Sequence, residues 1–193
     1  MTRVLILGAN GQLARHTTAY FLKKTDAHLT LYLRHASRLK NPDAKRAAIV
    51  EGDVLDRAAL IEAMTDQDVV FASLAGDMGE QARNIVTSMK EAGLKRLIFI
   101  SSMGIYGEVT GEKYRSVLDP YRDSAAVIEA SGLHYTVLRP GWFTHDPKVD
   151  YQITQKGEPF HGHDVSLNSL SDLIIKLAFD PMLHVRSSIG VSQ

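Results

Sequence analysis

Two glycines after a short apolar run near the start of the sequence give its clearest indication of chemistry. The run at residues 4–7 is too short for a buried helix, and Gly8 and Gly11 follow it. Gly8 can adopt the backbone angles of a tight turn, and Gly11 has no Cβ atom, so a phosphate can approach the main chain. A helix that begins there also offers an anion its unpaired N–H groups and the positive end of its dipole. We therefore expect a dinucleotide to contact Gly8, Ala9, Asn10, Gly11, Gln12 and Leu13.

Two glycines at this spacing also fit an ordinary turn between a strand and a helix, so the pattern is weak by itself. The surrounding sequence favours the dinucleotide. The helix predicted after the glycines runs through Tyr20 and Leu22, and a second apolar run follows at residues 29–33. This is the distance that a strand–helix–strand unit requires.

The residue that selects between the two nicotinamide dinucleotides is expected at the end of the second strand. An acidic side chain there would bind the ribose 2′-hydroxyl of NAD(H). This sequence has Arg34 at that place and Arg38 four residues later. A guanidinium suits the 2′-phosphate of NADP(H), so NADP(H) is favoured and NAD(H) is the less favoured cofactor. The alternative is an arginine that is simply solvated at the end of a strand.

Three later segments carry a family resemblance. They are Ser-Ser-Met-Gly-Ile-Tyr-Gly at 101–107, Pro-Tyr-Arg-Asp-Ser-Ala at 120–125 and Leu-Arg-Pro-Gly at 138–141. In that order they resemble the Ser-Ser-x-x-x-Tyr-Gly, Tyr-x-x-x-Lys and Arg-Pro-Gly segments of the short-chain dehydrogenase/reductase superfamily. With the glycine stretch and Gly52-Asp53-Val54, the resemblance extends over nearly the whole chain. The short length points to the atypical, NAD(P)H-binding, NmrA-like branch.

The resemblance implies a role for each matching position. Ser102 matches the serine that polarises a substrate carbonyl, and Tyr121 matches the proton donor, so these are the expected catalytic residues. Serines at strand ends and a tyrosine at a helix start also occur without such roles, and this alternative stays open. Further cofactor contacts are expected at Asp53, Val54, Ser73, Leu74, Ala75, Ser101, Arg139 and Pro140.

The sequence departs from the superfamily at the lysine four residues after the tyrosine, where it has Ala125. A methyl group cannot stabilise a phenolate, so we expect Tyr121 to be a poor acid–base catalyst at neutral pH. Two hypotheses follow. One is an NADPH-dependent oxidoreductase acting on a small planar or carbonyl acceptor that is quinone-, flavin- or tetrapyrrole-like. The other is an NADP(H)-binding redox sensor or regulatory protein without turnover.

Apolar runs alternate with amphipathic helical stretches along residues 3–138, and Gly93 and Gly132 mark the ends of two helices. This alternation predicts an α/β fold of the Rossmann type, with a doubly wound, mostly parallel sheet, helices on both faces and one domain over residues 1–193. Residues 142–193 are expected to form a small cap over the site, with a short strand at 151–154. Trp142, Phe143 and Tyr151 would be either walls for an acceptor ring or the core of that cap.

Composition narrows the classes of function. The chain has 22 basic and 22 acidic residues and no cysteine, so no overall field attracts nucleic acid, and disulfides and thiolate chemistry are excluded. His161 and His163 lack a third ligand, and we expect no metal site. The sequence has no signal peptide and no apolar span of about 20 residues, which predicts a cytoplasmic protein without membrane contact. The expected partner is a small-molecule substrate, and a homodimer is left open.

Overall fold

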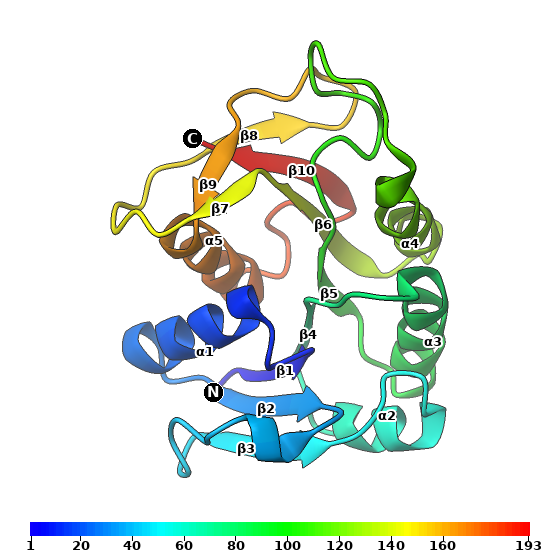
Figure 1. Ribbon diagram of the computed structural model, residues 1–193. Helices are drawn as coiled ribbons and strands as arrows, with labels where there is room; N and C mark the ends of the chain where they lie inside the picture. The colour runs from blue at the N-terminus through cyan, green and yellow to red at the C-terminus, as the bar shows by residue number, and fades with distance from the viewer.

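A mostly parallel sheet lies between two layers of helices in the computed structural model, which describes residues 1–193 (Figure 1). The strands are β1 (Arg3–Leu7), β2 (His28–Leu33), β3 (Ala47–Glu51), β4 (Val69–Ala72), β5 (Arg96–Ile100), β6 (His134–Pro140), β7 (Trp142–Thr144), β8 (Gln152–Gln155), β9 (Asp164–Ser166) and β10 (Ser187–Ser192). The helices are α1 (Gln12–Lys24), α2 (Arg57–Met64), α3 (Met78–Glu91), α4 (Asp119–Glu129) and α5 (Leu167–Phe179), with 3₁₀ turns η1 (Ala36–Arg38) and η2 (Ser116–Leu118).

The main sheet has eight strands in the order β3-β2-β1-β4-β5-β6-β10-β8, and β7 and β9 form a separate parallel pair. Within the main sheet only β8 runs antiparallel to its neighbour. The sheet grows outward in both directions from β1 and β4, which is the switch point of a doubly wound sheet. The predicted Rossmann-type fold is confirmed, and ligands of such sheets bind beyond the carboxyl ends of the strands.

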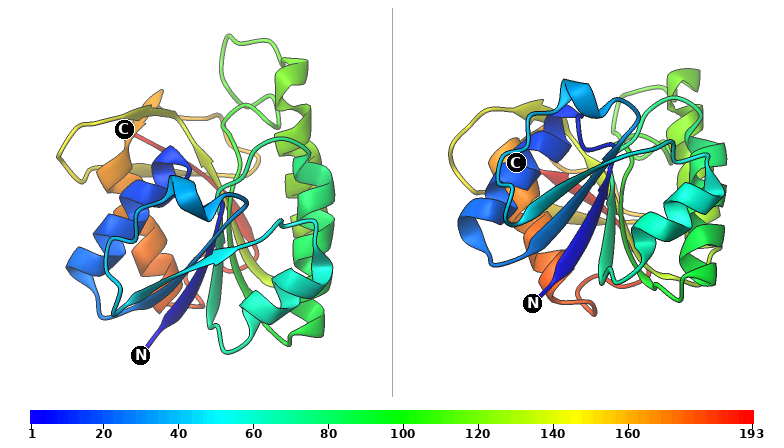
Figure 2. Two further views of the ribbon diagram at one scale, coloured as in Figure 1. Left: turned by 60° about the horizontal axis from the view of Figure 1, so that its bottom comes forward. Right: turned by 90° about the horizontal axis from the view of Figure 1, so that it is seen from below.

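Apolar side chains on both faces of the sheet explain why the strands are almost continuously apolar. Val4 and Ile6 belong to the core on the side of α1 and α5, and Leu5 and Leu7 belong to the core on the side of α2, α3 and α4. Figure 2 shows these two helical layers on opposite sides of the twisted sheet. No helix of the chain combines the length and the apolar character that crossing a membrane requires.

The C-terminal segment differs from the predicted cap. Within residues 142–193, β10 pairs with β6 and β8 pairs with β10, so both strands extend the main sheet. The apolar face of α5 is buried in the first core, where Leu170, Ile174 and Leu177 are fully covered. These parts therefore complete the sheet and its helical layer rather than capping the site. β10 and the β7–β9 pair were not predicted from the sequence.

Candidate cofactor site and active site

The turn after β1 requires a glycine. Gly8 has a φ of +78°, a left-handed conformation that other residues rarely adopt. A Cβ atom at Gly8 would lie 2.2 Å from the carbonyl oxygen of Ser73, at the end of β4. The N–H of Gly8 donates to the carbonyl of Tyr32 in β2 at 3.1 Å. The turn is therefore held between two neighbouring strands, and this fixes where α1 begins.

The first turn of α1 has N–H groups that no side chain of the protein covers. Gly11 is its N-cap residue, with no side-chain cap and no acidic residue in the first turn. By contrast, Asp56 and Asp77 cap α2 and α3 by accepting hydrogen bonds from their first turns. The Oδ1 atom of Asn10 is also buried without a partner, which is rare for a polar atom. Both features fit a dinucleotide, which offers phosphate oxygens to the N–H groups and hydroxyl donors to the amide oxygen.

A pocket of about 390 Å³ lies beyond the ends of β1, β2, β3 and β4, and we call it the cofactor pocket. Tyr32 lines it, and its hydroxyl donates to the carbonyl of Asp53 at 2.9 Å. Burial, with two nearby carboxylates, raises the pKa of Tyr32 to about 12, so the phenol stays protonated at neutral pH. The predicted cofactor residues that line the pocket are Gly8, Asn10, Gly11, Arg34, Arg38, Asp53, Val54, Ser73, Leu74 and Ala75.

Two arginines of the cofactor pocket have no acidic partner. Arg34 follows β2 and Arg38 ends η1, and both are exposed residues that line the pocket. Neither forms an ion pair, whereas Arg46 and Arg57 are each paired with a carboxylate. Both guanidinium groups are thus available to a phosphate dianion.

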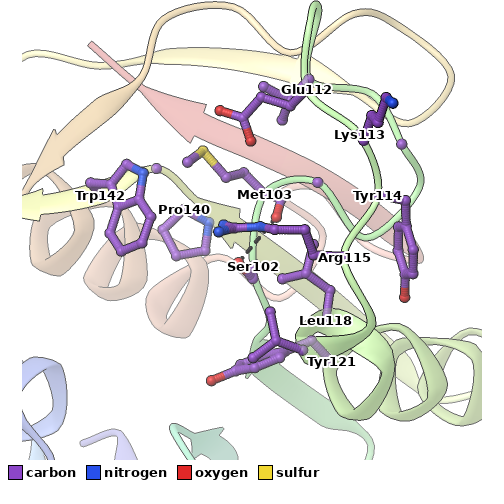
Figure 3. A pocket seen from close by; sticks show the side chains of 15 residues that line it. Ser102, Met103, Glu112, Lys113, Tyr114, Arg115, Leu118, Tyr121, Pro140 and Trp142 are labelled. Carbon is purple, nitrogen blue, oxygen red and sulfur yellow. Dashed lines mark hydrogen bonds between the residues drawn. The ribbon is translucent and has the colours of Figure 1, made fainter.

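A second pocket, of about 230 Å³, lies beyond the next two strands of the sheet, β5 and β6. Ser102, Tyr121 and Pro140 come together in its wall (Figure 3). The Ser102 hydroxyl donates to the carbonyl of Met103 at 3.0 Å, and the Tyr121 ring, which lines the pocket, extends away from α4. Ser101 is buried and donates to the carbonyl of Tyr121 at 3.2 Å. Ser101 therefore ties β5 to the start of α4 and so positions Tyr121.

The other walls of the second pocket are mainly apolar. Among the three aromatic residues predicted as walls, Trp142 lines the pocket and is 56% exposed. Phe143 and Tyr151 do not line it, and Tyr151 packs against the core beside α5. The remaining apolar side chains of the lining are Met103, Val109, Val117 and Leu118.

The position of the missing lysine is closed to solvent. Ala125 is fully buried among the residues of the second core, one turn after Tyr121 on α4. Arg122, the adjacent cation on α4, forms ion pairs with two aspartates of the same helix. Lys113 lines the second pocket. The cations that line the same pocket as the phenol, Lys113 and Arg115, both come from the loop of residues 101–118.

Arg139, a predicted cofactor contact, is a structural residue instead. Its side chain is fully buried, and its guanidinium pairs with the buried carboxylate of Glu108 and donates to Oγ of Ser188 at 3.2 Å. Glu108 also accepts from the N–H groups of Gly104 and Tyr106, at 3.1 and 2.9 Å. The ion pair thus fastens the loop of residues 101–118 to β6 and β10, and Arg139 lines neither pocket.

Two other predicted contacts, Ala9 and Leu13, can involve main-chain atoms only. The side chains of Ala9 and Leu13 are buried in the first core, and Gln12 is exposed at the start of α1. The sequence did not predict Glu108 or Arg115, and the structure places the Arg115 side chain in the second pocket. The only signal for Glu108 is an acid directly after the Tyr-Gly of the superfamily segment, and no pattern marks Arg115.

The fold and the uncovered helix start define a Rossmann-type nucleotide-binding domain. More narrowly, the chain belongs to the NAD(P)H-binding family, which it matches over residues 8–181. The resemblance to atypical short-chain dehydrogenases/reductases is thereby confirmed, and the protein is a member of an NAD(P)H-binding oxidoreductase family.

Several known proteins are similar to this chain. A Rossmann-fold NAD(P)-binding family protein from Shigella flexneri is 42% identical with a TM-score of 0.88, covering 100% of this chain and 94% of that one. A short-chain dehydrogenase/reductase from Veillonella parvula, solved in complex with NADP, is 31% identical with a TM-score of 0.90 and the same coverage. An isoflavone reductase homolog from Zea mays is 30% identical over 172 residues, which cover 82% of this chain and 54% of that protein. The chain spans about half the length of the curated relatives it matches.

Proposed function

We propose that this protein uses NADPH to reduce a small planar or carbonyl acceptor that is quinone-, flavin- or tetrapyrrole-like. The observation that carries the proposal is the position of the second pocket. It lies at the ends of β5 and β6, beside β4, which borders the cofactor pocket. A dinucleotide with its phosphates at α1 that extends along this edge would meet an acceptor held in the second pocket.

The residues present fit this cofactor. The uncovered N–H groups of α1, the unpartnered Oδ1 of Asn10 and the unpaired Arg34 and Arg38 each offer what NADPH needs. The Veillonella parvula relative, solved with NADP, supports the same choice. The name of the maize relative, an isoflavone reductase homolog, supports a flat conjugated carbonyl compound as acceptor.

The residues of the second pocket mainly position the acceptor. Bound NADPH supplies a hydride, so the acceptor takes two electrons and one proton from it and a second proton from water or an acidic side chain. Met103 and Pro140 offer apolar walls, and the Tyr121 hydroxyl can donate a hydrogen bond to an acceptor oxygen. The Ser102 hydroxyl can do so after it turns away from the Met103 carbonyl, because it has only one O–H group. Because Ala125 replaces the lysine that would lower the pKa of the tyrosine, Tyr121 is expected to be a poor proton donor. Acceptors that can take their proton from water are therefore favoured over simple ketones.

An acceptor screen tests this proposal. We expect NADPH to be oxidised, as followed by its absorbance, in the presence of quinones, flavins or linear tetrapyrroles and much more slowly with simple ketones. Calorimetry on the same protein measures NADPH binding. NADPH binding without turnover of any acceptor would reject the oxidoreductase and favour an NADP(H)-binding sensor, the candidate that the buried Ala125 supports.

The cofactor preference gives a first mutational prediction. The Arg34→Ala variant is expected to lose about 10-fold or more in NADPH affinity and to keep its NADH affinity, because only NADPH has a 2′-phosphate, and a hydrogen bond to a charged group contributes roughly 1.5 to 3 kcal/mol. Calorimetric titration of both cofactors measures this. Lys95→Ala removes an exposed positive charge at the other end of the sheet and is expected to change neither affinity. Preference of the unmodified protein for NADH, or an unchanged NADPH affinity in Arg34→Ala, would contradict the assignment.

The role of the phenol gives a second prediction. Tyr121→Phe is expected to lower kcat by less than ~10-fold, whereas removal of a true general acid typically costs ~10²- to 10⁴-fold. The reason is that Ala125 stands where the lysine would be and that Arg122 of α4 is already paired with two aspartates, so the hydroxyl is expected to position the acceptor. Steady-state kinetics with an acceptor found in the screen measures the effect. A loss of ~10³-fold or more at unchanged NADPH affinity would instead make Tyr121 an essential acid, with its supporting charge supplied by Lys113 or Arg115 of the same pocket.

A further inference from the structure

Arg115 is a cation in the second pocket that the family resemblance does not account for. It directly precedes η2 in the loop between β5 and α4, and its side chain lines the pocket. Figure 3 shows its guanidinium reaching across the pocket, above Ser102 and toward the side where Pro140 and Trp142 lie. The guanidinium makes no hydrogen bond and no ion pair within the chain. By contrast, Arg122 on the adjoining helix is paired.

The charged residues that line the second pocket have a net positive charge. Its lining has two cations, Lys113 and Arg115, and one carboxylate, Glu112. Glu112 forms no ion pair with either cation, and Figure 3 shows its carboxylate on a different side of the pocket from the Arg115 guanidinium. The rest of the lining is largely apolar.

We infer that the acceptor carries a carboxylate and that Arg115 binds it, while the apolar walls hold a flat ring. This inference rests on the proposed function and specifies its substrate class. A guanidinium presents a planar fork of donors that matches both oxygens of a carboxylate. Arg115 is thus a specificity-determining residue, and it differs from Arg34 and Arg38, which line the cofactor pocket at the ends of other strands.

Two probes that share one ring system and differ in charge test the inference through their binding affinities. Anthraquinone-2-carboxylate and its neutral analogue anthraquinone-2-carboxamide are titrated by calorimetry into the complex of the protein with NADP⁺. We expect the carboxylate to bind about 10-fold more tightly, because a charged hydrogen-bonded pair contributes roughly 1.5 to 3 kcal/mol and part of this is lost to solvent. The preference is expected to shrink as NaCl is raised, since salt screens exposed charges.

Three variants separate a charge contact from a packing contact. Arg115→Ala is expected to lower the affinity for the carboxylate probe about 10-fold and to leave the affinity for the carboxamide probe within about 2-fold of that of the unmodified protein. The preference for the carboxylate would then disappear. Arg115 is exposed, so the variant is expected to fold. Glu112→Gln is expected to strengthen carboxylate binding, because it removes a like charge from the pocket. Lys95→Ala, at the opposite end of the sheet, is expected to leave both affinities unchanged.

The remaining outcomes distinguish failure of the carboxylate inference from failure of the proposed function. Equal affinities, failure of both probes to bind, or an equal loss of both in Arg115→Ala would overturn the carboxylate inference. Turnover of neutral quinones without a carboxylate preference would reject the inference and keep the proposed function. An Arg115-dependent preference with no NADPH oxidation by any acceptor would keep the anion site and reject the oxidoreductase.

Discussion

Replacement of Gly11 by valine is expected to leave the chain folded and to weaken NADPH binding by at least ~100-fold, which corresponds to about 2.7 kcal/mol. Gly11 has φ −64° and ψ 156°, which any residue can adopt, and an added Cβ atom would have the Gly8 carbonyl oxygen as its nearest neighbour at 3.3 Å. Valine therefore fits after a small shift. Its methyl groups would occupy the space beside the uncovered N–H groups of α1, where the phosphates are expected to bind.

Circular dichroism of the valine variant and calorimetric titration with NADPH separate folding from binding. Gly11→Ala is a graded control, since one methyl group blocks less space and a smaller loss is expected. Gly8 is a poorer test site, because a Cβ atom there would lie 2.2 Å from a main-chain oxygen and the variant could fail to fold. A folded valine variant with unchanged NADPH affinity would show that the phosphates do not bind at this turn.

The parts of the fold that the sequence predicted are those with a strong local pattern. The run at 96–100 is apolar after its first residue and became β5, buried along its whole length. The face of α3 that carries Ala82, Ile85 and Met89 is buried, and the spacing of these residues by three and four positions is typical of one side of a helix. Gly93, with φ +72°, follows α3 where a helix ending was predicted. In each case the structure depends on residues that are close together in the sequence, so it could be predicted from one sequence alone.

β10 shows where the local pattern stops being informative. Only Ile189 and Val191 are strongly apolar in it, and they alternate with small residues. A Cβ atom at Gly190 would lie 2.8 Å from the ring of Phe160, and Ser188 accepts hydrogen bonds from Arg139 and Tyr106. The small residues of this strand are therefore selected by partners distant in the sequence, which no periodicity reveals.

The candidate site divides in the same way. Residues within two positions of a strand's end, such as Arg34, Asp53 and Ser102, could be assigned to one edge because parallel strands end together. Residues of the loop at 101–118 could not, since its conformation depends on long-range contacts. Hence Arg115 was missed in the second pocket, and Arg139 was assigned to a cofactor although Glu108 holds it in the interior.

Replacement of Arg139 by methionine is expected to destabilise the fold by about 3 to 5 kcal/mol, because it leaves the Glu108 carboxylate buried without its cation. The side chains of this pair are 0% and 6% exposed, so water cannot take over the role of the guanidinium. Urea unfolding measures the loss in stability. At low temperature, where the variant remains folded, its NADPH affinity is expected to equal that of the unmodified protein, because Arg139 does not line the cofactor pocket.

A double variant distinguishes the ion pair from simple loss of packing. Adding Glu108→Gln to Arg139→Met removes the buried charge that the single variant leaves unpaired, so it is expected to restore part of the lost stability. The carboxamide oxygen can still accept from the N–H of Gly104, but the NH₂ group cannot accept from the N–H of Tyr106, so the recovery is expected to be partial. A double variant no more stable than Arg139→Met would mean that packing dominates. A stable Arg139→Met protein whose NADPH affinity falls 10-fold or more would return Arg139 to the cofactor site, because a purely structural arginine cannot give that combination.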